Sequence, residues 1–274
     1  MKKLCIYHGN CVDGFGAAWA VRKALGEDNV DFHAGFFKNP PPNVFLRDVI
    51  IVDFSYKRDV LVSMAHDAER ILILDHHKSA EKELVDLPDN VTAIFDMGRS
   101  GAVMAWEYFH PEIPTPKLLQ HIEDRDLWRF NMQGTREVQA ALFSYPYDFD
   151  VWDTLVKSTL KLERDGVALE RKHFKDIHEF LEVATHRMRI AGYDVPAVNA
   201  PYFWSSDIGD ILKEGEPFVA CYWDEQDGIR QYSLRSAISG VDVSEIATLF
   251  GGGGHERAAG FSVPITYATM DPAG

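Results

Sequence analysis

Apolar runs that stop at polar residues recur along the first part of the chain. They cover 3–7, 30–36, 48–53, 71–74 and 91–95, and each is typical of a short strand. Between them, apolar positions at helical spacing predict helices over 15–25 and 57–68, the second with Ser55 as its N-cap. Strands that alternate with helices indicate a parallel sheet, because a helix is the usual crossover between parallel strands. The carboxyl ends of these strands should therefore converge in space.

The middle of the chain has a helical pattern. Ser100 precedes a predicted helix as its N-cap, which we favour over a catalytic serine because no base is spaced to activate it. A further amphipathic segment starts at Lys117 and ends at the acids Asp124 and Asp126. Acids at a helix C-terminus interact unfavourably with the helix dipole, so this pair does not stabilise the helix in the usual way. A solvent-exposed run of charges at the end of the helix is the alternative to a functional pair.

The last part of the chain alternates short strands and helices from about Ala191. Residues 218–223 and 228–236 predict a hairpin, and 243–250 predict a helix. We expect an α/β protein with a parallel-sheet domain over 1–148 and a helical connector over 149–190. A smaller α/β domain over 191–266 and a tail over 267–274 complete the expected organisation.

Composition and charge narrow the class of protein. Among the 274 residues, 46% are hydrophobic, yet no apolar run approaches the roughly 18 residues that a membrane helix needs. The first residues show no signal-peptide pattern, so we expect a cytoplasmic protein without a membrane partner. The net charge of −14 argues against a long duplex nucleic acid as partner, but a short phosphate-bearing substrate is compatible with it. Cys5, Cys11 and Cys221 show no C-x-x-C spacing, so neither a disulfide framework nor a structural zinc site is expected.

Candidate chemistry gathers where the predicted strands end. Asp75, His76 and His77 follow one strand directly and offer one oxygen and two nitrogen ligands. Such a set suits a divalent transition-metal ion better than Mg²⁺ alone. A polar turn after a strand explains these three residues equally well when they are taken alone. Acids and imidazoles at other strand ends favour the metal site over the turn.

Two other strand ends carry residues of the same chemical types. Asp53 ends the strand that begins at residue 48. The turn after the first strand holds His8, Asn10 and Asp13 near the start of a helix, whose N-terminus can also face a phosphate. Because these strand ends should converge, we expect the residues to form one site.

A glycine run marks a second candidate site near the end of the chain. Residues 251–254 are four consecutive glycines, followed by His255 and Arg257. Glycines let a backbone turn tightly and approach an anion, and the two side chains add hydrogen-bond donors beside it. A flexible surface loop is the alternative, but the apolar residues that follow at once argue against a linker. We therefore expect anion binding.

These motifs together resemble the DHH–DHHA1 phosphoesterase superfamily. The resemblance rests on Asp75-His76-His77, on His8, Asp13-Gly14 and Asp53 before it, and on Gly251-Gly-Gly-Gly-His-Glu-Arg-Ala-Ala-Gly260 after it. It covers nearly the whole chain and is greatest for the nanoRNase and oligoribonuclease branch. The resemblance implies an N-terminal DHH domain that holds two Mn²⁺ ions, a helical connector and a C-terminal DHHA1 domain that binds the substrate. Mg²⁺ or Co²⁺ would be the substitute ions.

The resemblance also implies roles for the metal ligands. His8 would ligate one metal ion, Asp53 would bridge the two ions, and Asp13 with His76 would hold the second. Asp124 would complete the second site, with Asp126 as the alternative.

Other residues would act on the substrate or on their neighbours. His77 would face the scissile phosphate, and Asp75 would orient the residues beside it. Arg235 would bind a substrate phosphate, together with the anion site formed by Gly252, Gly253, Gly254, His255 and Arg257. Family members commonly carry two acids in the first motif. Asn10 stands near the place of the first acid, so the ion held by His8 would have one fewer negative ligand.

The activity implied by the resemblance is two-metal hydrolysis of phosphodiesters in short RNA or related small nucleotides. A cyclic dinucleotide phosphodiesterase and a phosphoadenosine phosphate phosphatase are alternatives within the same superfamily. A nucleotide-binding sensor with little hydrolysis is the alternative from another functional class. The sequence is compatible with a homodimer.

Overall fold

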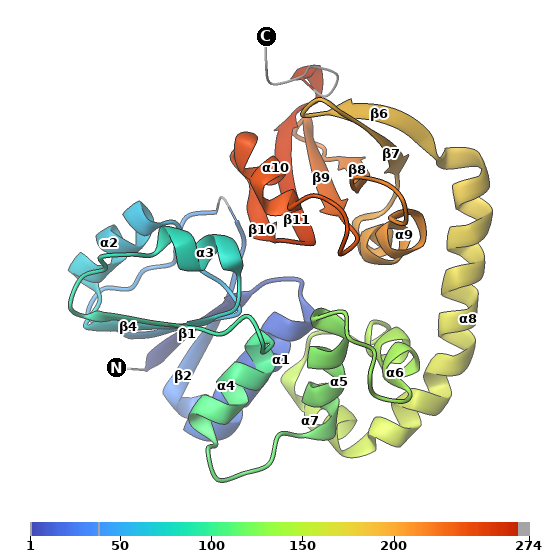
Figure 1. The fold of residues 1–274 in the computed structure, drawn as a ribbon. Helices are drawn as coiled ribbons and strands as arrows, with labels where there is room; N and C mark the ends of the chain where they lie inside the picture. The colour runs from blue at the N-terminus through green and yellow to red at the C-terminus, as the bar shows by residue number, and fades with distance from the viewer. Residues whose placement is uncertain (1, 38, 268–274) are drawn as a thin grey trace. The chain divides into compact units, whose positions relative to one another are not determined.

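The computed structural model describes residues 2–37 and 39–267 and divides the chain into two compact units (Figure 1). Unit 1 comprises Met1–Lys172 and unit 2 comprises His173–Gly274. The division falls inside the long helix α8, which runs over Thr159–Ala184. Each unit has its own sheet and its own buried apolar clusters.

Unit 1 is built on a five-stranded parallel sheet, as the strand and helix alternation predicts. The strand order is β2-β1-β3-β4-β5, and every neighbouring pair is parallel. The strands are β1 (Lys3–His8), β2 (Val30–Gly35), β3 (Asp48–Val52), β4 (Arg70–Asp75) and β5 (Val91–Phe95). The carboxyl ends of all five strands therefore lie at one edge of the sheet.

Helices cover both faces of this sheet. Side chains alternate along β3, so Ile50 and Val52 join one apolar cluster while Val49 and Ile51 join the other. Helices α1 and α4 pack on the first face, and α2 contributes Leu61 to the second. The α-helices of unit 1 before α8 are α1 (Val12–Leu25), α2 (Arg58–Asp67), α3 (Lys78–Glu83), α4 (Gly101–Phe109), α5 (Lys117–Asp126), α6 (Thr135–Leu142) and α7 (Phe149–Leu155). Short 3-10 helices cover Glu27–Asn29 and Val156–Ser158.

The two predicted helix caps have different outcomes. Ser100 is the N-cap of α4, and its hydroxyl oxygen accepts a hydrogen bond from the backbone N–H of Val103 (3.4 Å). The N-cap role of Ser55 is wrong, because α2 begins at Arg58 and Lys57 occupies its N-cap position. The Ser55 hydroxyl instead donates to Asp75. A serine that sequence analysis assigns to helix structure therefore lies beside the candidate site.

Unit 2 contains a six-stranded mixed sheet with the order β10-β11-β9-β8-β7-β6. The pair β7 and β8 is parallel, and the other pairs are antiparallel. The predicted hairpin is confirmed, since β8 (Val219–Asp224) pairs with β9 (Ile229–Arg235). The remaining elements are β6 (His186–Ile190), β7 (Tyr193–Asn199), α9 (Ser205–Leu212), α10 (Val243–Leu249), β10 (Gly253–His255), β11 (Ala258–Pro264) and 3-10 helices over Tyr202–Trp204 and Ile265–Tyr267.

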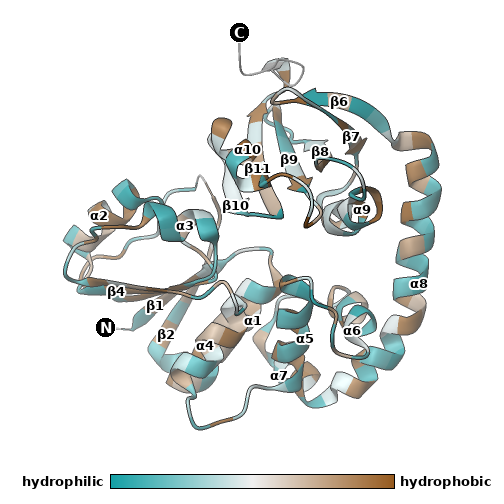
Figure 2. Ribbon diagram, in the orientation of Figure 1, coloured by the Kyte–Doolittle hydropathy of each residue, from teal (hydrophilic) through white to brown (hydrophobic). Residues whose placement is uncertain are grey.

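The predicted connector differs from the structure at its carboxyl end. Residues 186–190 belong to β6 rather than to a helix, because they pair with β7 and place Ile190 in the core of unit 2. Helix α8 ends before them and has mixed hydropathy along its length, with apolar and polar turns alternating in Figure 2. Of the predicted tail, only Tyr267 is described, as the last residue of a 3-10 helix, and 268–274 lie outside the described residues. No helix among the described residues could span a membrane, because none is both long and apolar enough.

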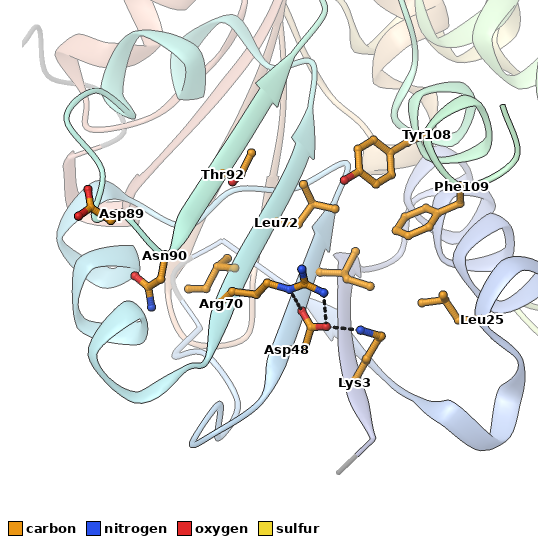
Figure 3. A pocket seen from close by; sticks show the side chains of 12 residues that line it. Lys3, Leu25, Asp48, Arg70, Leu72, Asp89, Asn90, Thr92, Tyr108 and Phe109 are labelled. Atoms are coloured by element: carbon orange, nitrogen blue, oxygen red, sulfur yellow. Dashed lines mark hydrogen bonds and ion pairs between the residues drawn. The ribbon is translucent and has the colours of Figure 1, made fainter.

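A cavity of about 410 Å³ lies at the amino ends of the strands of unit 1, which is the edge opposite the predicted site (Figure 3). Three of its charged groups, Lys3, Asp48 and Arg70, pair with one another. Arg70 donates to both carboxylate oxygens of Asp48 at 2.7 Å, and Lys3 contacts the same carboxylate. The hydrogen bonds from Arg70 and Lys3 lower the pKa of Asp48 to about 2. This charge cluster therefore ties three strands together at the edge away from the candidate chemistry.

Candidate metal centre

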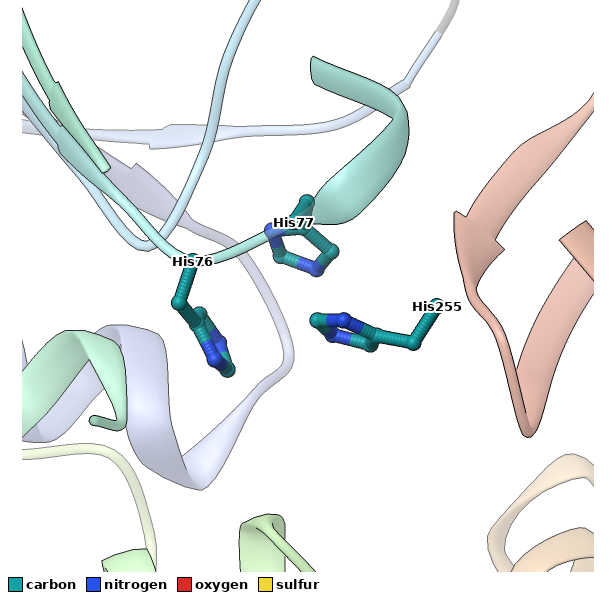
Figure 4. A group of neighbouring side chains, drawn as sticks. All are labelled: His76, His77 and His255. Carbon is teal, nitrogen blue, oxygen red and sulfur yellow. The ribbon is translucent and has the colours of Figure 1, made fainter. Parts of the chain in front are cut away.

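Asp75 ends β4, and the two histidines that follow it, His76 and His77, form the segment between β4 and α3 (Figure 4). Asp75 is fully buried. Its Oδ1 accepts hydrogen bonds from the His76 backbone N–H (2.8 Å) and from Nδ1 of His77 (2.6 Å), and its Oδ2 accepts from the Ser55 hydroxyl (2.6 Å). Burial would raise the pKa of Asp75, but the charge and hydrogen bond of His77 outweigh it and lower that pKa. Asp75 thus orients the backbone and the ring of its neighbours.

Asp53 follows β3 and lies between two histidines. Its backbone φ is 53°, in the left-handed region that few non-glycine residues adopt, and its N–H donates to the Leu74 carbonyl (2.9 Å). Oδ1 lies 3.0 Å from Nε2 of His76, and Oδ2 lies 3.5 Å from Nδ1 of His8. One carboxylate therefore faces the ends of both β1 and β4.

Asp13 reaches the same place from the first turn of α1. Its two oxygens accept hydrogen bonds from the backbone N–H groups of Gly101 (2.6 Å) and Ala102 (3.0 Å) at the start of α4. Its Oδ2 also lies 3.6 Å from Nε2 of His76. A Cβ on Gly101 would come within 2.4 Å of the Asp53 Cβ, so only glycine allows α4 to start this close to the site. The N-terminus of α4 thus holds the Asp13 carboxylate against His76.

The structure separates the two acids at the end of α5. Asp124 is buried and accepts hydrogen bonds from the N–H groups of Asn131 (2.8 Å) and Met132 (3.1 Å) and from the Thr135 hydroxyl (2.6 Å). Asp126 points the other way, and its Oδ2 lies 3.6 Å from Nε2 of His76. The alternative ligand Asp126 is therefore the one that the fold brings to the cluster, while Asp124 closes the loop before α6.

Among the described residues of unit 1, three groups of ligand atoms have every pair within 4.8 Å. The first is Asp13, His76 and Asp126, the second is His8, Cys11 and Asp53, and the third is Asp53, Asp75 and His77. Asp53 belongs to the second group through His8 and contacts the first through His76. Its position therefore matches that of a carboxylate shared by two ions.

Cys11 is the member of this cluster that sequence analysis misses, because it stands in no C-x-x-C pair. A signal was nevertheless present in the sequence, since Cys11 precedes a helix two residues before a candidate acid. Asn10, which was expected near the place of the first acid, is exposed and has a left-handed φ of 56°. The chain therefore turns at Asn10 and presents Cys11 toward His8 and Asp53.

The electrostatics of the cluster reflect several acids crowded in a buried place. Burial, together with the charges of Asp53 and Asp126, raises the pKa of Asp13 well above its usual range. Burial would lower the pKa of His76, but the contact with Asp53 and the charges of Asp126 and Asp13 raise it to about 11. Burial would raise the pKa of Asp53, yet its contacts with His76 and His8 hold it below the usual range. The carboxylates thus draw positive charge to this site.

The residues present fit divalent metal ions. Imidazole nitrogens and carboxylate oxygens converge from five strand and helix ends, which is a donor set that transition-metal ions bind. Among the described residues, Oδ2 of Asp53 is buried without a hydrogen-bond partner, which is costly for a carboxylate oxygen unless a cation neutralises it. A metal ion would supply that partner and offset the repulsion among the acids.

The residues predicted to bind the substrate lie in unit 2. Arg235 ends β9 and donates hydrogen bonds to the Ser233 hydroxyl (2.9 Å) and the Ser206 hydroxyl (2.8 Å). Arg257 donates to the Gly240 carbonyl (2.9 Å).

The glycine run is not a flexible loop, because Gly253, Gly254 and His255 form β10. A Cβ on Gly252 would lie 2.1 Å from the Gly260 carbonyl oxygen, and one on Gly254 would lie 2.6 Å from the Ala258 carbonyl oxygen. Packing against β11 therefore explains these two glycines without an anion.

Comparisons with known proteins give relatives along nearly the whole chain, although no family model matches it. The uncharacterized protein R106 of Acanthamoeba polyphaga mimivirus is 32% identical over 94% of this chain and 66% of its own length. Oligoribonuclease NrnB of Bacillus subtilis is 22% identical over 94% of this chain and 72% of its own length. The chain thus spans about two thirds of the mimivirus protein and somewhat more of NrnB.

Solved structures share the fold. The DHH domain of a member of a family of ribosomal proteins aligns over 94% of this chain and 82% of its own, with a TM-score of 0.59 and 15% identity. RecJ of Thermus thermophilus, solved in complex with Mn²⁺, aligns over 97% of this chain and 50% of its own, with a TM-score of 0.51 and 15% identity. The chain therefore has the fold of a DHH domain, and Asp75 ends β4 with His76 and His77 directly after it.

Proposed function

We propose that the chain is a metal-dependent phosphodiesterase that hydrolyses short oligoribonucleotides or related small nucleotides, with Mn²⁺ as its preferred ion. The observation that carries the proposal is the convergence of His8, Asp13, Asp53, His76 and Asp126 at the carboxyl edge of the parallel sheet. Open parallel sheets generally bind their ligands just outside the carboxyl ends of the strands. The relationship to NrnB, which is named an oligoribonuclease, supports the substrate class.

The cluster would divide its ligands between two ions. His8 and Asp53 would hold one ion, and Asp13, His76 and Asp126 would hold the other, with Asp53 shared between them. Bound there, divalent cations would supply Lewis-acid stabilisation to the oxygens of a phosphoryl group. Asp13 would keep its orientation through its two hydrogen bonds to the N-terminus of α4.

His77 would serve the phosphate rather than an ion. Its Nδ1–H donates to Asp75, which fixes the tautomer and leaves Nε2 as the nitrogen that exchanges a proton or donates to a phosphate oxygen. The buried Asp75 would hold the His77 ring in this orientation during the reaction.

An exposed aromatic ring beside the cluster supports a nucleotide as substrate. The Phe37 side chain is 58% exposed, and its ring centroid lies 5.4 Å from that of His8 and 4.9 Å from that of Phe54. An aromatic face held in this way can stack a base, an interaction worth about 1–3 kcal/mol. The roles of Arg235, His255 and Arg257 in binding substrate phosphate stay predictions.

A length series tests the proposal. Purified protein with Mn²⁺ should hydrolyse 5′-labelled RNAs of about two to ten nucleotides with a kcat/KM that falls as length increases. The reason is that a chain with a net charge of −14 offers little favourable surface to additional phosphates. A cyclic dinucleotide and phosphoadenosine phosphate in the same assay would identify the alternative substrates.

The controls separate hydrolysis from binding. The Asp53→Asn variant should lose product formation, because the shared carboxylate would no longer serve both ions. A rate that rises with RNA length would replace the proposal by a processive exonuclease. Tight nucleotide binding without product in the wild-type protein would instead favour the nucleotide sensor.

A further inference from the structure

Cys11 places a sulfur atom among the predicted metal ligands. A ligand atom of each of Cys11, His8 and Asp53 lies within 4.8 Å of the other two. The thiol is free of any disulfide. Cys11 is also the N-cap residue of α1, yet its side chain makes no capping hydrogen bond. Ordinary N-cap residues are Ser, Thr, Asp and Asn, whose oxygen satisfies an N–H of the first turn. A thiol is only a weak hydrogen-bond acceptor, so helix capping is a poor explanation for a cysteine at this position.

A second observation points to a ligand at the same place. The carboxylate of Asp53 is 1% exposed, and its Oδ2 has no hydrogen-bond partner among the residues that the structure describes. This oxygen lies 3.5 Å from Nδ1 of His8, in the group that contains the Cys11 sulfur. A buried carboxylate oxygen without a donor is rarely left so in a native protein, and a cation is the partner that its charge favours.

We propose that Cys11 is a thiolate ligand of the ion held by His8 and Asp53, and that this sulfur makes the two metal sites chemically unequal. The inference rests on the metal centre of the proposed function. The first site would offer nitrogen, oxygen and sulfur, whereas the site of Asp13, His76 and Asp126 offers nitrogen and oxygen alone.

The consequence is a difference in metal preference between the sites. Thiolates favour softer ions such as Zn²⁺ and Co²⁺, and carboxylates and imidazoles accept Mn²⁺. The Cys11 site should therefore select Zn²⁺ or Co²⁺ over Mn²⁺, so the preference for Mn²⁺ in the proposed function would apply to the other site alone. Sulfur would also supply the negative ligand that Asn10 does not carry. The thiol releases its proton to solvent as the sulfur–metal bond forms, so the ligand carries one negative charge.

Burial and the charges of Asp53 and Asp13 raise the pKa of the Cys11 thiol well above its usual range. Cys11 would therefore become a thiolate only when a bound cation offsets that negative charge. Gly14 lets helix α1 start close to β1, since a Cβ there would come within 2.3 Å of the His8 carbonyl oxygen. The tight turn from β1 into α1 is what sets the thiol beside His8.

Spectroscopy of the Co²⁺ protein tests the proposal without reference to activity. Titration of the metal-free wild-type protein with Co²⁺ should give a sulfur-to-cobalt charge-transfer band in the near ultraviolet. Cys11→Ser should abolish the band and weaken Zn²⁺ binding at one site by at least about tenfold. Removal of a residue that only supports a metal ligand already lowers metal affinity by about that factor. Cys221→Ala is the matched control, since this thiol is buried in unit 2, and it should keep the band.

A second variant and a second measurement keep the test decisive. Cys11→Asp replaces sulfur by a carboxylate, so it should lose the band and the Zn²⁺ preference while it still binds Mn²⁺. Should Cys11→Ser fail to fold, alkylation of the wild-type protein followed by peptide mapping gives the answer, because bound Zn²⁺ should protect Cys11 from the reagent.

The outcomes distinguish the two proposals from each other. Co²⁺ that binds without a charge-transfer band, or a band that survives in Cys11→Ser, would refute the sulfur ligand and leave the metal centre standing. Failure of every divalent ion to bind, measured by metal counting, would refute both.

Discussion

The buried carboxylate of Asp75 makes a sharp test of the site, because Asp75→Asn removes its charge and nearly preserves its shape. The wild-type Oδ1 accepts from the His77 ring at 2.6 Å and from the His76 N–H at 2.8 Å. An asparagine carbonyl can still accept both bonds, and Ser55 can turn its hydroxyl to accept from the new amide. The variant should therefore fold and lose only the electrostatic part of the interaction.

The size of the loss follows from the hydrogen bonds that Asp75 accepts. Hydrogen bonds to a charged group contribute about 1.5–3 kcal/mol and neutral ones about 1 kcal/mol, so Asp75→Asn should lower the free energy of unfolding by roughly 1–2 kcal/mol. Groups that orient a metal ligand or catalytic histidine typically contribute about 10–100-fold to activity, and we expect kcat to fall in that range. Ser55→Ala, which removes one hydrogen bond to Asp75, should lower stability by about 1 kcal/mol and affect kcat less.

Two measurements on the same preparations check this expectation. Urea unfolding gives the stability change, and hydrolysis of a labelled dinucleotide with saturating Mn²⁺ gives kcat. A tenfold fall in kcat corresponds to about 1.4 kcal/mol of activation free energy, which is similar to the expected loss of stability. An Asp75→Asn protein that loses stability but keeps kcat within about twofold of wild type would therefore refute the reasoning. His77 would then not depend on the charge of Asp75.

Two further predictions concern acids with different roles. Asp126→Ala should weaken binding of one Mn²⁺ ion by at least about tenfold with little loss of stability. Asp124→Ala should instead lower the free energy of unfolding by about 3 kcal/mol, because it leaves three hydrogen-bond donors without an acceptor. Calorimetric titration measures the metal affinity and urea unfolding measures the stability, and equal metal affinities in the two variants would contradict the prediction. Arg70 and Lys3 lower the pKa of Asp48 to about 2 in the folded protein, compared with about 3.9 in the unfolded chain. The ion pair therefore stabilises the fold fully above pH ~3.9, and this contribution disappears as the pH falls through about 2. The difference in unfolding free energy between wild type and Asp48→Asn should shrink over that interval, and a difference that stays constant would contradict the ion-pair explanation.

The parallel sheet and its chemistry could be predicted from sequence because each strand carries its own signal. Continuous apolar runs mark strands buried on both faces, and the residue after such a run lies at the carboxyl edge of the sheet. Asp53 and His76 follow this rule directly. The strand that begins at His186 escaped prediction, because its charged residues continue the polar pattern of α8 and only pairing with β7 turns it into β6.

The choice between Asp124 and Asp126 could not be made from sequence for a geometric reason. Residues two apart on a helix point in nearly opposite directions, so either acid can face the site depending on how α5 rotates. The loop that returns after α5 decides the rotation, since its N–H groups bind Asp124. Cys11 was missed for a different reason, because its spacing from the other cysteines gives no metal-site pattern and its nearness to His8 appears only in the folded turn after β1.

The left-handed backbone of Asp53 has a consequence for how this protein can evolve or be engineered. A φ of 53° is unfavourable for a residue with a side chain by roughly 1–2 kcal/mol, although aspartate tolerates it better than most. Glycine would relieve this strain but would remove the carboxylate that faces both histidines. Relief of this backbone strain would therefore remove the group on which the proposed hydrolysis depends, so backbone stability and the proposed function conflict at this position.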